Sequence, residues 1–220
     1  EDSNDFKKNY YKIETYLFQN CESLKSKIAV YEEISSKSLS NKPKALKFYA
    51  KGIDENEKQN FKKAIKFFKK AVSIDENFAF AWDNLGITYR KLNNFDKAIE
   101  SYEKSLEIDP YGKMPLQNIA VTYQYKKDYK KAIQAYERLA NIDENNPEIY
   151  YGLGQIYSLN FENYEKGLDY MCKAYTLYTA QKSPYRVDAE KIINIIHSKM
   201  KEQNQTDEFD KILIANKISQ

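Results

Sequence analysis

Apolar residues in this chain recur with the period of an α-helix, and the whole pattern then recurs every 34 residues. The clearest marker is a small residue, Ala64, Ala98 and then Ala132, followed four positions later by an aromatic ring. In the middle copy, two successive stretches have apolar residues three, four or seven positions apart, a spacing typical of amphipathic helices. Their apolar positions are Trp82, Leu85, Gly86 and Tyr89, then Ala98, Ile99, Tyr102 and Leu106. The pattern predicts tandem helical hairpins, with a turn at residues 93–94 in this copy.

The middle copy, residues 79–112, resembles the tetratricopeptide repeat, a helix–turn–helix unit of 34 residues. The residues that carry the resemblance are Trp82, Leu85, Gly86, Tyr89, Phe95, Ala98, Tyr102 and Pro110. The resemblance implies an all-α fold, a right-handed α–α superhelix with flanking N- and C-terminal helices. Because Gly86 and Ala98 are small, we expect the two helices of this repeat to approach each other closely.

The same spacing divides the chain into an extension, an array and a cap. We predict an N-terminal helical extension over residues 1–42 and four repeats within 43–181, at 45–78, 79–112, 113–146 and 147–181. The fourth repeat fits only if one residue is inserted in its turn, around 160–163. Because the last hairpin of an array leaves an apolar face uncovered, residues 182–220 are predicted to form capping helices.

Composition and motifs argue against an enzyme. The 35 basic and 32 acidic residues give a net charge of +3 and are interspersed, which disfavours a nucleic-acid partner. Cys21 and Cys172 match no metal or redox spacing, and the single histidine, His197, has no evident catalytic partners. No glycine-rich phosphate loop, nucleophile motif or metal-ligand cluster is present. We therefore expect no catalytic, cofactor-binding or metal-binding residues and no cofactor.

The resemblance implies instead a concave groove, lined mainly by the first helix of each repeat, that binds a protein or peptide. Asn84 and Asn118 occupy equivalent positions in adjacent repeats, and an asparagine amide can pair with the backbone of an extended peptide. Apolar neighbours would add contact area. The complete set of candidate partner-binding residues is Asn84, Asn118, Phe80, Ile87, Arg90, Met114, Val121, Tyr125 and Tyr151.

The functional hypothesis is a non-catalytic scaffold that holds a partner protein or peptide in this groove. The alternative is a self-associating assembly protein, a homo-oligomer whose N-terminal helices pack on another copy or in its own groove.

No stretch reaches the ~20 apolar residues of a transmembrane helix. The polar start at residues 1–5 without an initiator methionine favours an exported, periplasmic or lipid-anchored protein, with a cytoplasmic location as the alternative. Abundant Lys, Asn, Ile and Tyr suggest an AT-rich, bacterial genome.

Overall fold

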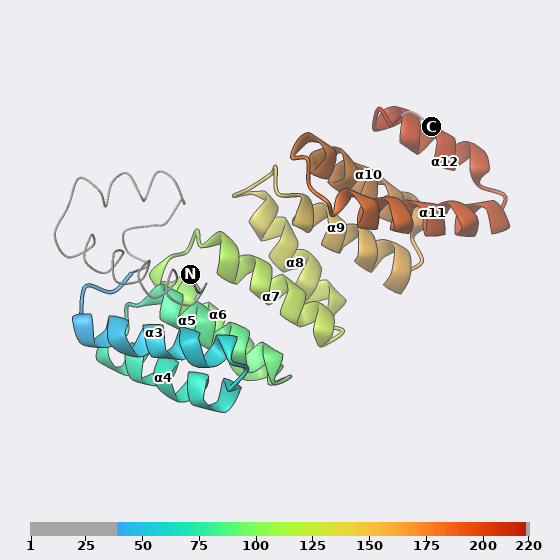
Figure 1. The fold of residues 1–220 in the computed structure, drawn as a ribbon. Helices are drawn as coiled ribbons and strands as arrows, with labels where there is room; N and C mark the ends of the chain where they lie inside the picture. The colour runs from blue at the N-terminus through green and yellow to red at the C-terminus, as the bar shows by residue number, and fades with distance from the viewer. Residues whose placement is uncertain (1–38, 219–220) are drawn as a thin grey trace, which may run out of the picture. The chain divides into compact units, whose positions relative to one another are not determined.

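The computed structural model describes residues 39–218 (Figure 1). In this part of the chain the secondary structure is entirely helical, with ten α-helices and one short π-helix. The chain divides into two compact units, Glu1–Asn118 and Ile119–Gln220, which are described separately below. The predicted N-terminal extension, residues 1–42, lies almost wholly outside the described residues.

The first unit is built from two helical hairpins and the start of a further helix. Its helices are α3 (Pro43–Glu57), α4 (Phe61–Ile74), α5 (Ala79–Lys91), α6 (Phe95–Ile108) and the beginning of α7 (Lys113–Tyr125). Helix α3 packs on α4, α4 on α5, and α5 on α6 (Figure 1). Since the connections are only a few residues long, consecutive helices run antiparallel.

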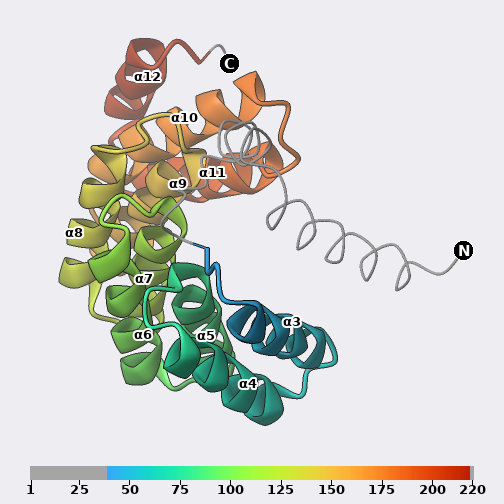
Figure 2. The same cartoon turned by 90° about the vertical axis from the view of Figure 1, so that its left-hand side faces the viewer.

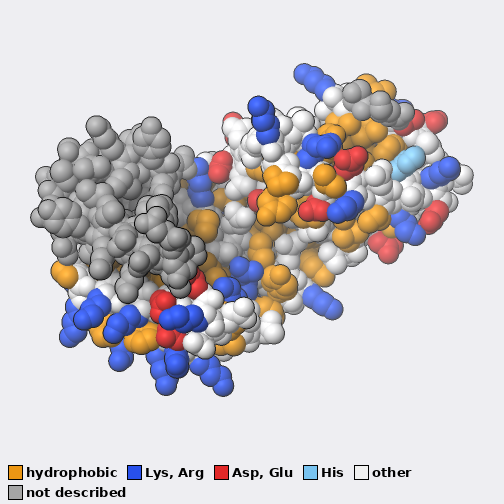
Figure 3. Space-filling model, in the orientation of Figure 1, with side chains coloured by type: hydrophobic (Ala, Val, Ile, Leu, Met, Phe, Trp, Pro, Cys, Tyr) orange, Lys and Arg blue, Asp and Glu red, His pale blue; other side chains and the backbone are white. Residues whose placement is uncertain are grey.

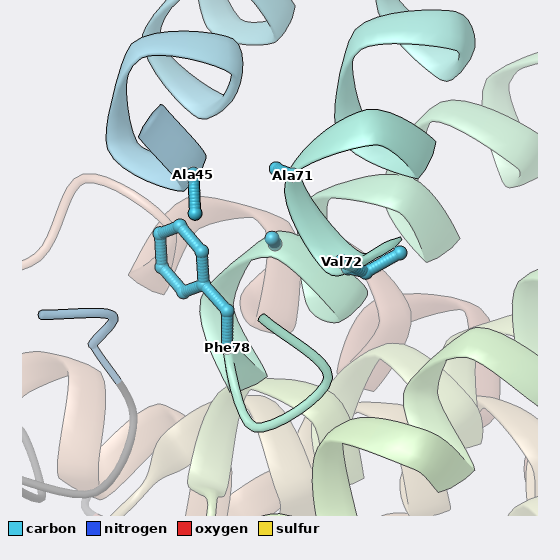
Figure 4. Packing of buried hydrophobic residues seen from close by; sticks show 5 residues of the cluster. Ala45, Ala71, Val72 and Phe78 are labelled. Carbon is cyan, nitrogen blue, oxygen red and sulfur yellow. The ribbon is translucent and has the colours of Figure 1, made fainter. Parts of the chain in front are cut away.

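Small residues allow the helices of this unit to pack closely around a few large rings. A buried cluster joins α3, α4 and α5, and Figure 4 shows the Phe78 ring extending toward Ala45. The Phe78 ring also lies 4.8 Å from the ring of Tyr49, measured between centroids. Complete burial of such a ring stabilises the fold by roughly 1.5–3 kcal/mol. The members of the cluster are Ala45, Ala71, Val72, Phe78 and Ala81.

The expected close approach between α5 and α6 is present. A Cβ atom added to Gly86 would lie 2.5 Å from Cε1 of Tyr102 and 3.0 Å from the carbonyl oxygen of Ala98. Tyr102 and Ala98 are both completely buried. Glycine at position 86 is therefore required by the packing of the two helices, and the ring that recurs four residues after each alanine fills the space beside the contact.

The turns within the hairpins use a residue in the left-handed region of backbone conformation. In the first unit, Gln59 has a φ of 59° and Asn93 a φ of 57°, and the two residues are 34 apart. In the second unit, Lys127 has a φ of 60°. Asparagine tolerates this conformation well because its short side chain can hydrogen-bond to the nearby backbone. Gln59 and Lys127 lack this compensation, so the left-handed conformation is costly for them.

The second unit contains the rest of α7 and continues through α8 (Tyr129–Ala140), α9 (Pro147–Gln155), α10 (Tyr164–Ala180), α11 (Arg186–Glu202) and α12 (Thr206–Ala215). A π-helix, η1 (Ile156–Asn160), extends α9. Here the amide of Phe161 donates to the carbonyl of Ile156, five residues earlier, at 3.1 Å. A π-helical turn accommodates one additional residue, and it lies directly before the turn in which the sequence pattern places an insertion.

Helices α11 and α12 pack on α10 (Figure 2). The buried face of α11 carries Ala189, Ile193, Ile196 and Met200, and the buried face of α12 carries Phe209 and Leu213. These side chains are spaced three or four residues apart, so each helix presents one apolar face to the unit and a polar face to solvent.

Candidate protein-binding surfaces

In the first unit, the candidate binding residues lie on α5 and at the start of α7. Phe80, Ile87 and Arg90 of α5 are half-buried. Met114 of α7 is 57% exposed, which is a high value for a large apolar side chain. Phe80 packs against the buried cluster between α3, α4 and α5, so its ring is partly used by the core.

The amide of Asn84 is hydrogen-bonded within the protein. Its Nδ2 atom donates to the hydroxyl of Tyr49 on α3, at 3.1 Å, and to the carbonyl oxygen of Phe80, at 3.0 Å. Both amide hydrogens therefore have acceptors. The sequence interpretation of Asn84 did not include this hydrogen bond between α3 and α5. With both amide hydrogens used, only the side-chain oxygen of Asn84 is left to accept a hydrogen bond from a peptide.

Asn118 makes the equivalent hydrogen bond one repeat later. Its Nδ2 atom donates to Oδ1 of Asp83 at 3.2 Å, and its Oδ1 atom lies 3.5 Å from a guanidinium nitrogen of Arg90. Asn84 with Tyr49 and Asn118 with Asp83 are each separated by 35 residues. In both cases, an asparagine reaches back to the preceding first helix. These asparagines thus connect adjacent repeats.

Asp83 is the most unusual charged group on this surface, because it is only 3% exposed. Burial raises the pKa of its carboxyl group from 3.8 to about 6, although the hydrogen bond from Asn118 and the positive charge of Arg90 both lower it. The carboxylate is thus ionised at neutral pH in a poorly solvated position, where it accepts a hydrogen bond from Asn118 and is stabilised by the positive charge of Arg90.

In the second unit, the candidate residues are Val121 and Tyr125 of α7 and Tyr151 of α9. Val121 and Tyr151 are half-buried, whereas Tyr125 is 60% exposed. Nearby on α7, Oε1 of Gln124 accepts a hydrogen bond from the Tyr136 hydroxyl at 2.8 Å, and its Nε2 lies 3.4 Å from the carbonyl oxygen of Gly152. Gln124 therefore supports the packing of α8 and α9 on α7.

Tyr151 belongs to an aromatic group that the sequence interpretation missed. Its ring meets that of Tyr178 edge-on with centroids 6.3 Å apart, and the centroid of the Tyr185 ring lies 6.2 Å from that of Tyr178. The hydroxyl of Tyr178 donates to Oε1 of Glu148 at 2.7 Å. Burial, followed by the negative charges of Asp188 and Glu148, raises the pKa of Tyr151.

Helix α11 also presents apolar side chains that the sequence interpretation assigned only to a cap. Val187 is 46% exposed and Ile195 is 45% exposed. They lie eight residues apart, and neither belongs to the buried face formed by Ala189, Ile193 and Ile196. The signal was available in the sequence, because α11 carries more apolar residues than a single buried face requires.

Among residues 39–218, no group of three or more His, Cys, Asp or Glu side chains is arranged to hold a metal ion. The ring of His197 stacks on Phe209, with centroids 4.4 Å apart. Cys172 is fully buried, and burial raises the pKa of its thiol to about 12. Its thiolate is thus disfavoured at neutral pH. Within the same residues, every helix is too short or too polar to span a bilayer.

Helical hairpins that recur every 34 residues and pack on their neighbours define a helical-repeat protein. The chain belongs to the tetratricopeptide repeat family. A family model described as Tetratricopeptide repeat matches residues 79–111, and one described as TPR repeat matches 122–160. A second model described as Tetratricopeptide repeat matches 55–78 and 147–180. Comparison with curated protein sequences gave no match.

Solved structures with this fold include MamA proteins. A structure titled as the MamA RS-1 ArsTM double mutant is 20% identical and has a TM-score of 0.66, covering 81% of this chain and 97% of its own. MamA 41-end from Desulfovibrio magneticus RS-1 is 19% identical, with a TM-score of 0.65, and covers 80% of this chain and 95% of its own. At this level of identity, the likeness establishes the all-α tetratricopeptide-repeat fold.

Proposed function

We propose that this protein is a non-catalytic scaffold that binds a partner protein or peptide through the exposed side chains of its first helices. The observation that carries the proposal is the exposure of large apolar residues on α7, where Met114 is 57% exposed and Tyr125 is 60% exposed. Side chains of these types are enriched in protein interfaces. The tetratricopeptide-repeat fold supports a role in protein interaction. That this chain binds a partner through α7 is our proposal.

The contacts of the candidate residues suggest different roles within such an interface. Met114 and Tyr125 would supply apolar contact area, and Tyr151 would add an amphipathic ring. Asn84 and Asn118 would contribute less than their sequence positions imply, because their amides already connect adjacent helices. Replacing these asparagines would therefore test repeat packing and partner binding at the same time.

Site-specific photocrosslinking separates binding from stability. The full chain would carry p-benzoylphenylalanine in place of Tyr125, or in place of Ile214, which is 74% exposed on α12 and serves as the matched control. After irradiation in the native cell, we expect a discrete protein adduct at position 125 and none at position 214. No adduct at position 125, or the same adducts at both positions, would contradict the proposal.

The same experiment addresses self-association. An adduct formed between two copies of this chain would favour the homo-oligomeric alternative over a separate partner. Sedimentation at several concentrations would then show whether the dimer also forms without crosslinking.

A further inference from the structure

Positive charge is concentrated in the first hairpin. Residues 42–70 contain ten lysines and three acidic residues, a net charge of +7, whereas the whole chain carries +3. The rest of the chain is therefore net negative. Figure 3 shows basic side chains gathered over α3 and α4.

Most of these lysines are exposed and form no ion pair with another described residue. Elsewhere in the chain, many lysines are neutralised by a carboxylate one turn away: Lys191 pairs with Asp188 at 3.0 Å and Lys199 with Glu202 at 2.9 Å. We call the unneutralised set the lysine patch: Lys44, Lys47, Lys51, Lys62, Lys66, Lys69 and Lys70.

Two lysines of the lysine patch lie over aromatic rings. Phe48 of α3 and Phe67 of α4 stack with their centroids 6.3 Å apart, and both rings are half-buried. The ammonium group of Lys70 lies 5.3 Å from the Phe48 centroid, and that of Lys51 lies 5.8 Å from the Phe67 centroid. The patch therefore combines a diffuse positive charge with a neighbouring pair of stacked aromatic rings.

We propose that the lysine patch docks the protein on an anionic lipid bilayer. A negatively charged membrane surface attracts clustered lysines without requiring a fixed geometry for each one. Long lysine side chains can lay their methylene groups along an apolar surface and extend their charges to the headgroups. The Phe48–Phe67 pair would lie at the headgroup level, where aromatic rings are favourable.

Two features favour a bilayer over nucleic acid. Residues 42–70 contain no arginine, although arginine is preferred for bidentate contacts with individual phosphates and base edges. In addition, Phe48 and Phe67 stack on each other and are approached by lysines, so they do not form open platforms for bases.

The test is cosedimentation of the full chain with vesicles of phosphatidylcholine alone and with 30% phosphatidylglycerol. We expect binding only to the anionic vesicles at 0.1 M salt, and release at 0.5 M salt because the charges are screened. Neutralising Lys51, Lys66 and Lys70 together to glutamine should weaken partitioning by on the order of a hundredfold, roughly fivefold for each lysine.

A matched control neutralises Lys191, Lys199 and Lys211, which are paired with carboxylates in the second unit. This variant has the same net charge and should bind anionic vesicles like the wild type. A second test variant, with Lys44, Lys62 and Lys69 changed to glutamine, keeps both lysine–phenylalanine contacts. It should also lose binding, which separates charge from any effect on folding.

Several results would overturn the proposal. The proposal fails if the protein does not bind anionic vesicles, or if it binds neutral vesicles equally well. It also fails if both lysine-patch variants bind like the wild type, or if the control variant loses as much vesicle binding as they do. Retention of a 30-base-pair RNA duplex at least as tight as vesicle binding, and lost in the lysine-patch variants, would assign the surface to nucleic acid instead.

Discussion

Replacement of the buried carboxylate Asp83 by the isosteric amide, Asp83→Asn, should stabilise the protein at pH 8 and have little effect below pH 4. Burial raises the pKa of Asp83 from 3.8 to about 6. Since the folded protein holds this proton more tightly than the unfolded chain, the stability contributed by Asp83 is greatest below pH 4. It falls as the pH rises to about 6 and then remains low.

The size of the effect follows from the difference between the two pKa values. About two pKa units correspond to roughly 3 kcal/mol of stability lost between low pH and pH 8. An asparagine at this position can still accept the hydrogen bond that Asn118 donates at 3.2 Å, and it carries no charge that burial would penalise. For a chain of this length, a gain of this size corresponds to about 6–12 °C in the melting temperature.

Thermal unfolding followed by circular dichroism, at a series of pH values from 4 to 8, measures this dependence. The control is Asp54→Asn, which changes the net charge equally at a side chain that is 58% exposed. It should change the melting temperature little at any pH. A constant gain for Asp83→Asn across the pH range, or a loss at pH 8, would refute the argument from burial.

Two further substitutions test the packing of the hairpins. Lys127→Gly should stabilise by about 0.5–1 kcal/mol in thermal unfolding, because Lys127 has a φ of 60° that glycine adopts without a steric cost. The same change at Lys126, whose φ is not positive, should give no gain, and equal effects at the two positions would exclude the conformational explanation. Gly86→Ala should cost about 1–3 kcal/mol in urea unfolding, because its Cβ would lie 2.5 Å from a ring carbon of Tyr102. If the urea midpoint of Gly86→Ala equals that of the wild type, α5 and α6 can move apart to admit the methyl group without loss of stability.

The helical architecture could be predicted from the sequence because it depends on spacing. Three alanines 34 residues apart, each with a ring four positions later, identify the hairpins before any coordinates are known. The one-residue insertion in the fourth repeat could also be predicted from the sequence, but the backbone conformation around it could not. Residues 156–160 form a π-helical turn, which accommodates one additional residue, where α9 packs on α10.

The roles of individual surface residues were harder to predict. Asn84 and Asn118 were interpreted as amides available to a peptide, whereas their Nδ2 atoms bind Tyr49 and Asp83 on the preceding first helix. A single repeat pattern does not reveal a contact between neighbouring repeats. The lysine patch was missed for another reason, because the near-balanced charge of the whole chain conceals a local charge of +7 over residues 42–70.

The two proposed surfaces differ in chemistry, so salt should distinguish them. Raising the salt concentration from 0.1 to 0.5 M shortens the screening length from about 10 Å to roughly 4 Å, which weakens contacts made by exposed lysines. Apolar contacts made by Met114 and Tyr125 are not weakened in this way. We therefore expect vesicle binding to be lost at 0.5 M salt while the crosslink at position 125 persists. Loss of both would mean that the partner is also held by charge, and that the apolar residues of α7 are not its main contacts.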